Sequence, residues 1–261
     1  MHKGLLLIHG VGCGGEVWDR MRPAFEAEGY TVDAPTLFPD RRTISDPPET
    51  LCDLRLADYI EAMSEAAARL ADKTGQRPAV MGHSMGGLIA QHLAARGDVS
   101  AAVFLTPAQP KGCTVFNFKV LRTFAALFAI GRKKLPNTPV KVGPKGFSWG
   151  VVNLVDPARH AEIYAQARYD SGKVYMDLSE PEPIDAADVK VPTLTIAATK
   201  DRATIAKAVR KVAAKYAGAA VPGAFLEYPE NAHWIVDEPG TDAVTSDILS
   251  WLNSLAPAAK A

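Results

Sequence analysis

Residues 79–90 read AVMGHSMGGLIA, and this stretch decides the fold. The apolar residues 79–82 predict a short buried strand, and the apolar run that starts at Met85 predicts a helix. Between them, the motif Gly82-His-Ser-Met-Gly86 requires a tight turn, in which the two glycines leave room where a Cβ would clash. A G-x-S-x-G motif between a strand and a helix lifts a serine hydroxyl above the end of a sheet. Ser84 is therefore our candidate nucleophile.

Outside this motif, short apolar segments alternate with longer amphipathic ones along most of the chain. Such apolar strands, separated by helices, predict a mostly parallel sheet of about six strands with helices on both faces, which is an α/β fold. We expect strands at Gly4–Ile8, Tyr30–Ala34, Ala79–Gly82, Ala101–Thr106, Thr193–Ala198 and Ala224–Tyr228. We expect core helices at Glu16–Glu28, Leu54–Asp72, Met85–Ala95, Ile205–Ala217 and Ala243–Leu255.

One long segment interrupts this alternation. Residues 109–183 contain no clear core strand and instead predict two helices, Phe116–Ile130 and Pro157–Ala167, joined by a loop rich in Pro, Gly and Lys. An insertion of this length in a compact domain is usually functional. We expect residues 1–108 and 184–261 to form the core and the insertion to form a cap over the active site. Extra packing helices without substrate contact are the alternative.

A serine hydroxyl needs a base that takes its proton, and the chain offers six histidines. His233 follows the last predicted strand, in a loop that reads PENAHW over residues 229–234. Loops at the carboxyl ends of parallel strands are where this architecture presents catalytic groups. The other histidines fit terminal, turn, helix or cap positions: His2, His9, His83, His92 and His160. We therefore predict that His233 is the base.

The acid that orients the histidine is expected between the serine and the histidine in the chain. Asp201 directly follows the predicted strand Thr193–Ala198, at the end of the sheet where Ser84 is expected. Four other acids lie before that strand or too close to His233 along the chain: Asp185, Asp188, Glu230 and Asp237. Asp201 is the predicted orienting acid, and a surface ion pair with a neighbouring basic residue is its alternative role.

Acyl transfer also needs backbone donors for the oxyanion that develops on the substrate. One donor is expected at the N–H of Met85, directly after the nucleophile. The other is expected in the glycine-rich loop after the first strand, HGVGCGG at residues 9–15, with Val11 as the donor. Cys13 in this loop fits a packed small residue better than a pocket wall.

The same loop permits a second interpretation. Gly10, Gly12 and Gly15 satisfy the pattern G-x-G-x-x-G between a strand and a helix, and Asp33 ends the next strand where a ribose-binding acid would lie. These residues alone are typical of an oxidoreductase that binds NAD or NADP. That interpretation leaves the candidate serine, aspartate and histidine without a role, so we keep it as a distant alternative.

Composition argues against several other classes of protein. The 29 basic and 29 acidic residues give a net charge of zero, which argues against nucleic-acid binding. No apolar run is long enough for a signal peptide core or a membrane span. Three cysteines without CxxC or metal-ligand spacing fit a reducing compartment. We expect a cytoplasmic monomer or small homo-oligomer that needs no metal or organic cofactor.

Over nearly its whole length the chain resembles the α/β-hydrolase family. The features that carry the resemblance are the strand end His9-Gly10, the GHSMG turn at Ser84, Asp201 after the penultimate strand and the late His233 loop. The resemblance implies an α/β-hydrolase fold with a helical cap and the activity of a serine esterase or lipase. A serine in the turn also argues against epoxide hydrolases and haloalkane dehalogenases, which use an aspartate there.

The loop HGVGCGGEVW at residues 9–18 is also similar to that of small plant esterases and hydroxynitrile lyases. This similarity implies a lyase alternative. The lyases carry a lysine directly after the catalytic histidine, whereas this chain has Trp234. Cyanohydrin cleavage is therefore disfavoured and ester hydrolysis is retained.

The expected substrate is a small ester with an apolar acyl or aryl group, because the predicted cap is rich in aromatic residues. Trp149, in a glycine-flanked loop, is the one aromatic residue that we predict to contact substrate. Lactones, thioesters and activated amides react by the same chemistry, so they remain open as substrates.

Overall fold

A computed structural model describes residues 3–255, and its centre is one six-stranded parallel sheet. The strands lie in the order β2-β1-β3-β4-β7-β8, and every neighbouring pair is parallel. Their bounds are β1 Lys3–Ile8, β2 Tyr30–Asp33, β3 Ala79–His83, β4 Ala101–Leu105, β7 Thr193–Ala198 and β8 Ala224–Tyr228. The predicted α/β fold with about six strands is confirmed.

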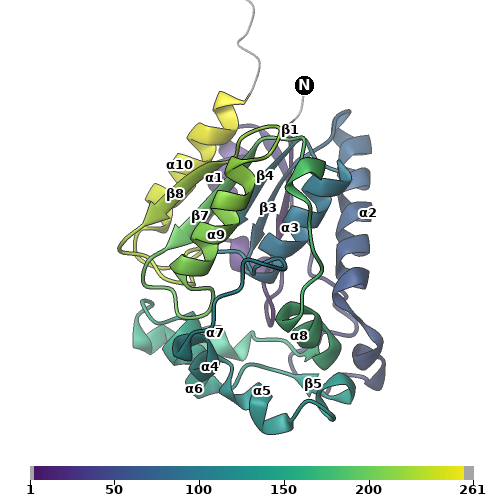
Figure 1. The fold of residues 1–261 in the computed structure, drawn as a ribbon, viewed down its shortest axis with the longest axis vertical. Helices are drawn as coiled ribbons and strands as arrows, with labels where there is room; N and C mark the ends of the chain where they lie inside the picture. The colour runs from purple at the N-terminus through teal and green to yellow at the C-terminus, as the bar shows by residue number, and fades with distance from the viewer. Residues whose placement is uncertain (1–2, 256–261) are drawn as a thin grey trace, which may run out of the picture.

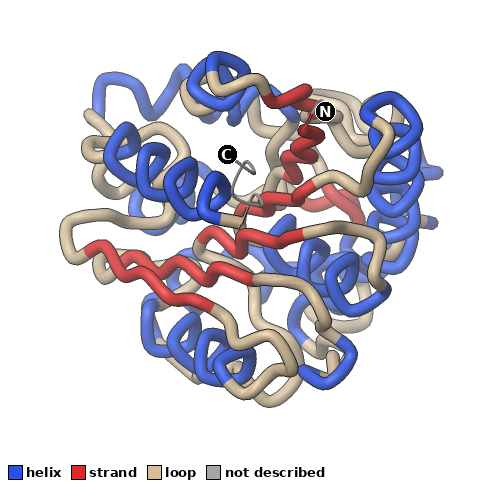
Figure 2. Tube along the Cα trace, turned by 90° about the horizontal axis from the view of Figure 1, so that it is seen from above, coloured by secondary structure: helices blue, strands red, loops and turns tan. Residues whose placement is uncertain are grey.

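Helices cover both faces of this sheet (Figures 1 and 2). Alternate side chains of a strand point to opposite faces, and in β1 Leu6 and Ile8 pack into one buried cluster while Leu5 and Leu7 pack into another. The first cluster contains residues of α2 (Leu56–Thr74), α3 (Met85–Arg96) and α9 (Ala206–Ala217). The second contains residues of α1 (Arg22–Ala27) and α10 (Thr241–Ser254).

One core helix differs from its prediction. The single helix expected over Glu16–Glu28 is wrong: a 3-10 turn at Gly15–Trp18 is followed by the shorter α1. Pro23 accounts for the difference, because proline lacks an N–H and fits the first turn of a helix but not its interior. Further 3-10 turns in the described chain lie at Glu49–Asp53, Leu135–Asn137, Pro157–Arg159 and Ala186–Asp188.

The segment 109–183 lies beyond the carboxyl ends of the sheet strands, at the lower end of the molecule in Figure 1. Its short helices are α4 Phe118–Thr123, α5 Ala125–Ile130, α6 Pro144–Gly146, α7 His160–Ala165 and α8 Gly172–Ser179, with a π-helical turn at Phe147–Val151. A two-stranded antiparallel sheet joins β5 (Pro139–Val140) to β6 (Asp170–Ser171). The segment thus contributes nothing to the central sheet.

Two details of this segment differ from the sequence-based expectation. The single helix expected over Phe116–Ile130 is broken at Phe124 into α4 and α5. The hydroxyl of Thr123 lies 2.9 Å from the carbonyl of Lys119, four residues earlier, and a bond of this kind bends helices. Helix α8 has no counterpart among the helices expected from sequence, although the Ser171 side chain caps its first turn by accepting the N–H of Lys173.

Candidate active site

Ser84 occupies the turn between β3 and α3 with a strained backbone. Its φ and ψ are 54° and −118°, values that a residue with a side chain rarely adopts and that cluster at functional sites. A Cβ on Gly82 would overlap the backbone of Gly86, and a Cβ on Gly86 would overlap the carbonyl of Ile8. The two glycines therefore allow the close approach of strand and helix that holds Ser84 in this turn.

A continuous chain of hydrogen-bond contacts joins the three residues singled out from sequence. Ser84 Oγ lies 3.1 Å from His233 Nε2, and His233 Nδ1 lies 2.8 Å from Asp201 Oδ2. Ser84, Asp201 and His233 follow β3, β7 and β8, so the carboxyl ends of three strands of the same sheet bring these side chains together. All three residues are buried, so water competes little for these contacts.

The carboxylate of Asp201 is held by donors on both oxygens. Oδ1 accepts the backbone N–H groups of Ala203 and Thr204, at 2.7 and 2.8 Å, while the Thr204 hydroxyl lies 2.8 Å from Oδ2. Burial opposes ionisation of this carboxyl, but the adjacent His233 and these hydrogen bonds outweigh it and hold the pKa of Asp201 below its ordinary value. Asp201 is therefore an ionised acceptor that faces His233.

Two further residues position the His233 loop. Burial, and then the neighbouring His233, lower the pKa of His83 to about 3, so the neutral ring donates its Nε2–H to the carbonyl of His233 over 2.8 Å. The buried Glu238 carboxylate accepts the N–H of Ala232 at 2.6 Å and the side-chain amide of Asn231 at 3.1 Å. The loop that carries the base is thus fixed from both sides.

The residues predicted as oxyanion donors lie beside the serine. Val11 and Met85 border the same cavity as Ser84, and a Cβ on Gly10 would lie only 3.0 Å from the Ser84 Cβ. Within residues 3–255, the N–H groups of Val11 and Met85 have no hydrogen-bond acceptor. Both amides are therefore free to bind an oxygen of a ligand.

A cavity of about 410 Å³ opens on this side of Ser84. Most of its wall is apolar, and most of the lining residues belong to segment 109–183, including Val120, Phe124, Leu127 and Met176. A volume in this range and an apolar wall with few polar groups are typical of small-molecule sites.

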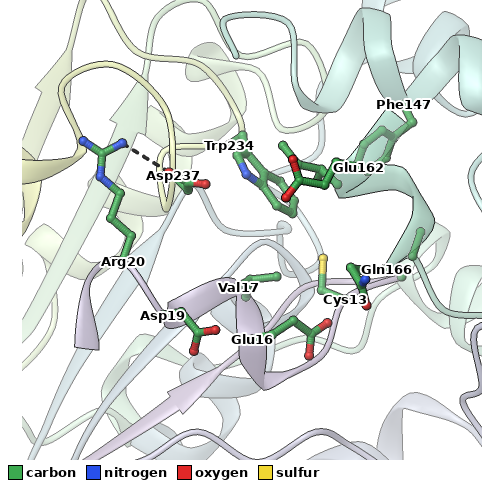
Figure 3. Close-up of a pocket in the computed structure, with 13 residues that line it drawn as sticks. Cys13, Glu16, Val17, Asp19, Arg20, Phe147, Glu162, Gln166, Trp234 and Asp237 are labelled. Atoms are coloured by element: carbon green, nitrogen blue, oxygen red, sulfur yellow. Dashed lines mark hydrogen bonds and ion pairs between the residues drawn. The ribbon is translucent and has the colours of Figure 1, made fainter. Parts of the chain in front are cut away.

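A second, much smaller hollow of about 20 Å³ also borders Ser84, and His233 lines this one. Cys13, Phe147 and Trp234 line both this hollow and an outer cavity of about 180 Å³, whose lining residues Figure 3 shows. These three side chains are buried, and Trp234 and Phe147 lie opposite the acidic side chains at the bottom of the view. The space next to His233 is therefore narrow. Cys13 is packed in the second buried cluster, as expected, and it also lines this space.

Trp149 lies apart from these cavities and does not border any of the three. Its ring is stacked between the guanidinium groups of Arg122 and Arg202, whose carbon atoms are 4.2 and 4.6 Å from the ring centre. Its carbonyl accepts a hydrogen bond from Arg202. The structure thus gives Trp149 a packing role and does not bring it to the serine.

The acids set aside in the sequence lie in other contacts. Glu230 pairs with Lys200 on the surface, and Asp237 pairs with Arg20 and Arg159. The ion pair considered for Asp201 with a neighbouring basic residue is absent from the described residues, because Lys200 and Arg202 have the partners named above.

Sequence reasoning missed Thr204 and Glu238. Thr204 stands three residues after Asp201, a spacing at which an aspartate often accepts backbone N–H groups of a turn, so a local signal existed. Glu238 contacts Ala232, six residues earlier in the His233 loop, and no sequence motif predicts that contact. Within residues 3–255, no cluster of three or more His, Cys, Asp or Glu side chains is placed to hold a metal ion, and no helix is long and apolar enough to cross a bilayer.

Comparisons with known proteins show which proteins the chain is similar to. Among curated proteins, lipase LipV of Mycobacterium tuberculosis is 39% identical over 107 residues, which are 40% of this chain and only 37% of the lipase. Among solved structures, Paleococcus ferrophilus monoacylglycerol lipase is similar with a TM-score of 0.71 and 20% identity, over 97% of this chain and 95% of that chain. The Arabidopsis methylesterase MES16 has a TM-score of 0.73 and 16% identity, over 97% of this chain and 100% of that chain.

The identities of 20% and 16% to these two solved structures show a shared fold and no more. The decisive match is that of the alpha/beta hydrolase family, whose model covers residues 5–245. The chain therefore belongs to the alpha/beta hydrolase family.

Proposed function

We propose that this protein hydrolyses carboxylic esters through an acyl-enzyme on Ser84. The observation that carries the proposal is the buried chain of contacts from Ser84 Oγ through both nitrogens of His233 to the Asp201 carboxylate. Esterases and lipases among the similar proteins support the same reaction class. In this proposal Ser84 is the nucleophile, His233 the base and Asp201 the group that orients the imidazole.

The reaction follows from these roles. Ser84 Oγ attacks the ester carbonyl as His233 Nε2 takes its proton, and the N–H groups of Val11 and Met85 bind the resulting oxyanion. The imidazolium, stabilised by Asp201, then gives that proton to the leaving alkoxide, which departs as an alcohol. Water attacks the acyl-enzyme by the same route, with His233 again as base, and releases the acid and free Ser84.

The two cavities that border Ser84 suggest how an ester would lie. The leaving alkoxide takes its proton from His233 Nε2, so the alcohol group must lie on the side of the narrow hollow that His233 lines. The acyl group then lies in the apolar cavity of about 410 Å³ under segment 109–183, which we propose as a cap. A water molecule's share of liquid is about 30 Å³ and a methylene group is similar in size, so roughly a dozen methylene groups fill that volume.

Hydrolysis of p-nitrophenyl esters by the wild-type protein and by Ser84→Ala tests the proposal. We expect the variant to lose several orders of magnitude in kcat, because only oxyanion binding then remains. A fluorophosphonate probe should label the wild-type protein at Ser84 and leave the variant unlabelled. Equal activity of the two proteins, or labelling elsewhere in the wild type, would overturn the mechanism.

The lyase alternative receives little support from the site. The residue after His233 is the buried indole of Trp234, which supplies no charge. Lys141 borders the hollow beside Ser84, but its ammonium group donates to the carbonyl of Ile44 over 2.8 Å. Lactones and thioesters fit the same proposed chemistry, and including them in the ester panel would rank them against esters.

A further inference from the structure

A buried ion pair lies behind the loop that supplies the Val11 N–H. Arg42 Nε is 2.5 Å from Asp170 Oδ1 and Arg42 Nη2 is 3.1 Å from Asp170 Oδ2, and both side chains are 0% exposed. Arg42 follows β2 in the core, whereas Asp170 begins β6 in segment 109–183. Burial of two charges is costly unless their geometry and remaining hydrogen bonds are good, so the further contacts of this pair matter.

Both members of the pair hold the loop at residues 9–15. Asp170 Oδ2 accepts the N–H of Gly12 over 2.6 Å, and Arg42 Nη2 donates to the carbonyl of Cys13 over 3.0 Å. The carbonyl of Gly12 accepts the N–H of Arg168 over 2.8 Å. Gly12 has a φ of +69°, a conformation that favours glycine. The two residues after Val11 are therefore fixed by groups outside the loop.

The residue before Val11 is fixed through His9. His9 Nε2 accepts the N–H of Leu37 at 3.1 Å and faces Arg42 Nη1 at 3.3 Å, so the proton is on Nδ1, which donates to the carbonyl of Gly10 over 2.8 Å. Burial and then the charge of Arg42 lower the pKa of His9 to about 3, which keeps the ring neutral. The Gly10 carbonyl and the Val11 N–H belong to one planar trans peptide and point in opposite directions. Holding that carbonyl therefore aims the N–H.

We propose that Asp170 and Arg42 are positioning residues, which hold the Val11 N–H where the oxyanion develops and so couple segment 109–183 to the reaction. The inference rests on the proposed ester hydrolysis. Oxyanion donors act because they are already in place when charge develops. Loss of the pair should therefore reduce kcat and leave substrate binding in the apolar cavity intact.

The main test replaces the whole pair in the full-length protein, as Arg42→Met with Asp170→Leu. Exchange of a buried ion pair for apolar residues of similar volume is often tolerated, whereas loss of one partner strands a buried charge. We expect a folded protein whose kcat on p-nitrophenyl butyrate falls about 10- to 100-fold with an unchanged KM, less than the roughly 100- to 1000-fold loss when a donor is removed. Arg42→Lys, which keeps the charge but not the guanidinium donors, gives a second reading and should lower kcat at least fivefold.

The matched control is the ion pair of Arg55 and Asp177, which also joins the core to segment 109–183 but is only partly buried and does not contact the loop at residues 9–15. Arg55→Met with Asp177→Leu should keep kcat within twofold. The inhibition constant of a trifluoromethyl ketone, whose hemiketal oxygen binds where the oxyanion would, should rise in the Arg42 and Asp170 variants by the factor that kcat falls.

The outcomes separate the two proposals. Wild-type kcat in the folded double variant, or in Arg42→Lys should the double variant not fold, would overturn the positioning role alone. Equal losses in the control pair would also overturn it, because docking of segment 109–183 in general would then be the cause. A wild-type protein that hydrolyses esters no faster than Ser84→Ala would overturn the proposed function and this inference together.

Discussion

Replacing Asp201 by asparagine should disable the proposed mechanism although the size of the side chain hardly changes. The two backbone N–H groups at Oδ1, from Ala203 and Thr204, can be accepted only by an oxygen. The asparagine side chain must therefore keep its oxygen at that position and turn its NH₂ group towards His233 Nδ1. His233 must then accept on Nδ1 and carry its proton on Nε2, which is the nitrogen that should receive the proton of Ser84.

The size of the effect follows from this reversal. The variant loses the usable tautomer and also the negative charge, 2.8 Å away, that stabilises the imidazolium. A change of this kind in a serine protease triad lowers kcat by roughly 10,000-fold, which corresponds to about 5.5 kcal/mol of barrier. We expect a loss of the same order for Asp201→Asn, with KM little changed because the apolar cavity is intact.

The assay is steady-state hydrolysis of p-nitrophenyl butyrate, with circular dichroism to show that the variant is folded. Glu230→Gln and Asp237→Asn are matched controls, because each removes one carboxylate charge near the His233 loop from an ion pair with Lys200 or with Arg20 and Arg159. Both should stay within about threefold of wild type. An Asp201→Asn enzyme that kept more than a tenth of kcat would refute the assigned role, as would an equal loss in either control.

Three other properties of the structure are open to measurement. Burial, as the largest cause, lowers the pKa values of His9 and His83 to about 3, so the unfolded chain binds more protons than the native protein below pH 6.5. Because of these two histidines, the free energy of unfolding should fall by up to about 2.7 kcal/mol for each pH unit as the pH is lowered from 6 to 4. Denaturant titrations that gave the same free energy of unfolding at pH 6 and pH 4 would contradict this. Methyl decanoate should be cleaved faster than its isomer nonyl acetate, because a long alkyl chain fits only the cavity of about 410 Å³, where we place the acyl group. The rates can be followed by titrating the acid that is released. Faster cleavage of nonyl acetate would show that the acyl and alcohol groups are placed the wrong way round. Burial raises the pKa of the Cys13 thiol to about 12, so iodoacetamide at pH 8 should alkylate Cys13 only after unfolding. Rapid alkylation of Cys13 in the native protein, measured by mass spectrometry, would contradict the burial of this side chain.

The sequence was informative wherever one local pattern determines one local structure. The apolar runs predicted all six sheet strands to within one residue at each end, because buried parallel strands need continuous apolar side chains. The turn at Ser84 was equally predictable, because the glycines that a tight turn needs for steric reasons lie within the same five residues. The break in the helix expected over Phe116–Ile130 was harder to predict from a local pattern. The Thr123 hydroxyl contacts the carbonyl of Lys119 in the same helix and also the carbonyl of Arg202, which is distant along the chain.

Positions that depend on contacts between distant segments were not predictable in this way. Asp170 and Arg42 are 128 residues apart and belong to no short motif. Trp149 shows the converse error, because a glycine-flanked tryptophan suggested a pocket and two arginines at distant positions instead enclose its ring. In both cases the deciding partner lies in a different segment, and spacing along the chain carries no information about it.

The glycine-rich loop shows how such a partner decides between two motifs. A dinucleotide site needs free backbone N–H groups that can surround a pyrophosphate. In this loop Gly12 donates to the Asp170 carboxylate, Gly14 donates to the Glu16 carboxylate and Gly15 donates to the Thr36 hydroxyl. Those amides are already occupied, two of them by negative charge that would repel a phosphate. The loop leaves the Val11 N–H free beside Ser84. The glycines of the pattern G-x-G-x-x-G therefore serve the packing around a candidate oxyanion donor, and their bonded N–H groups do not fit a dinucleotide site.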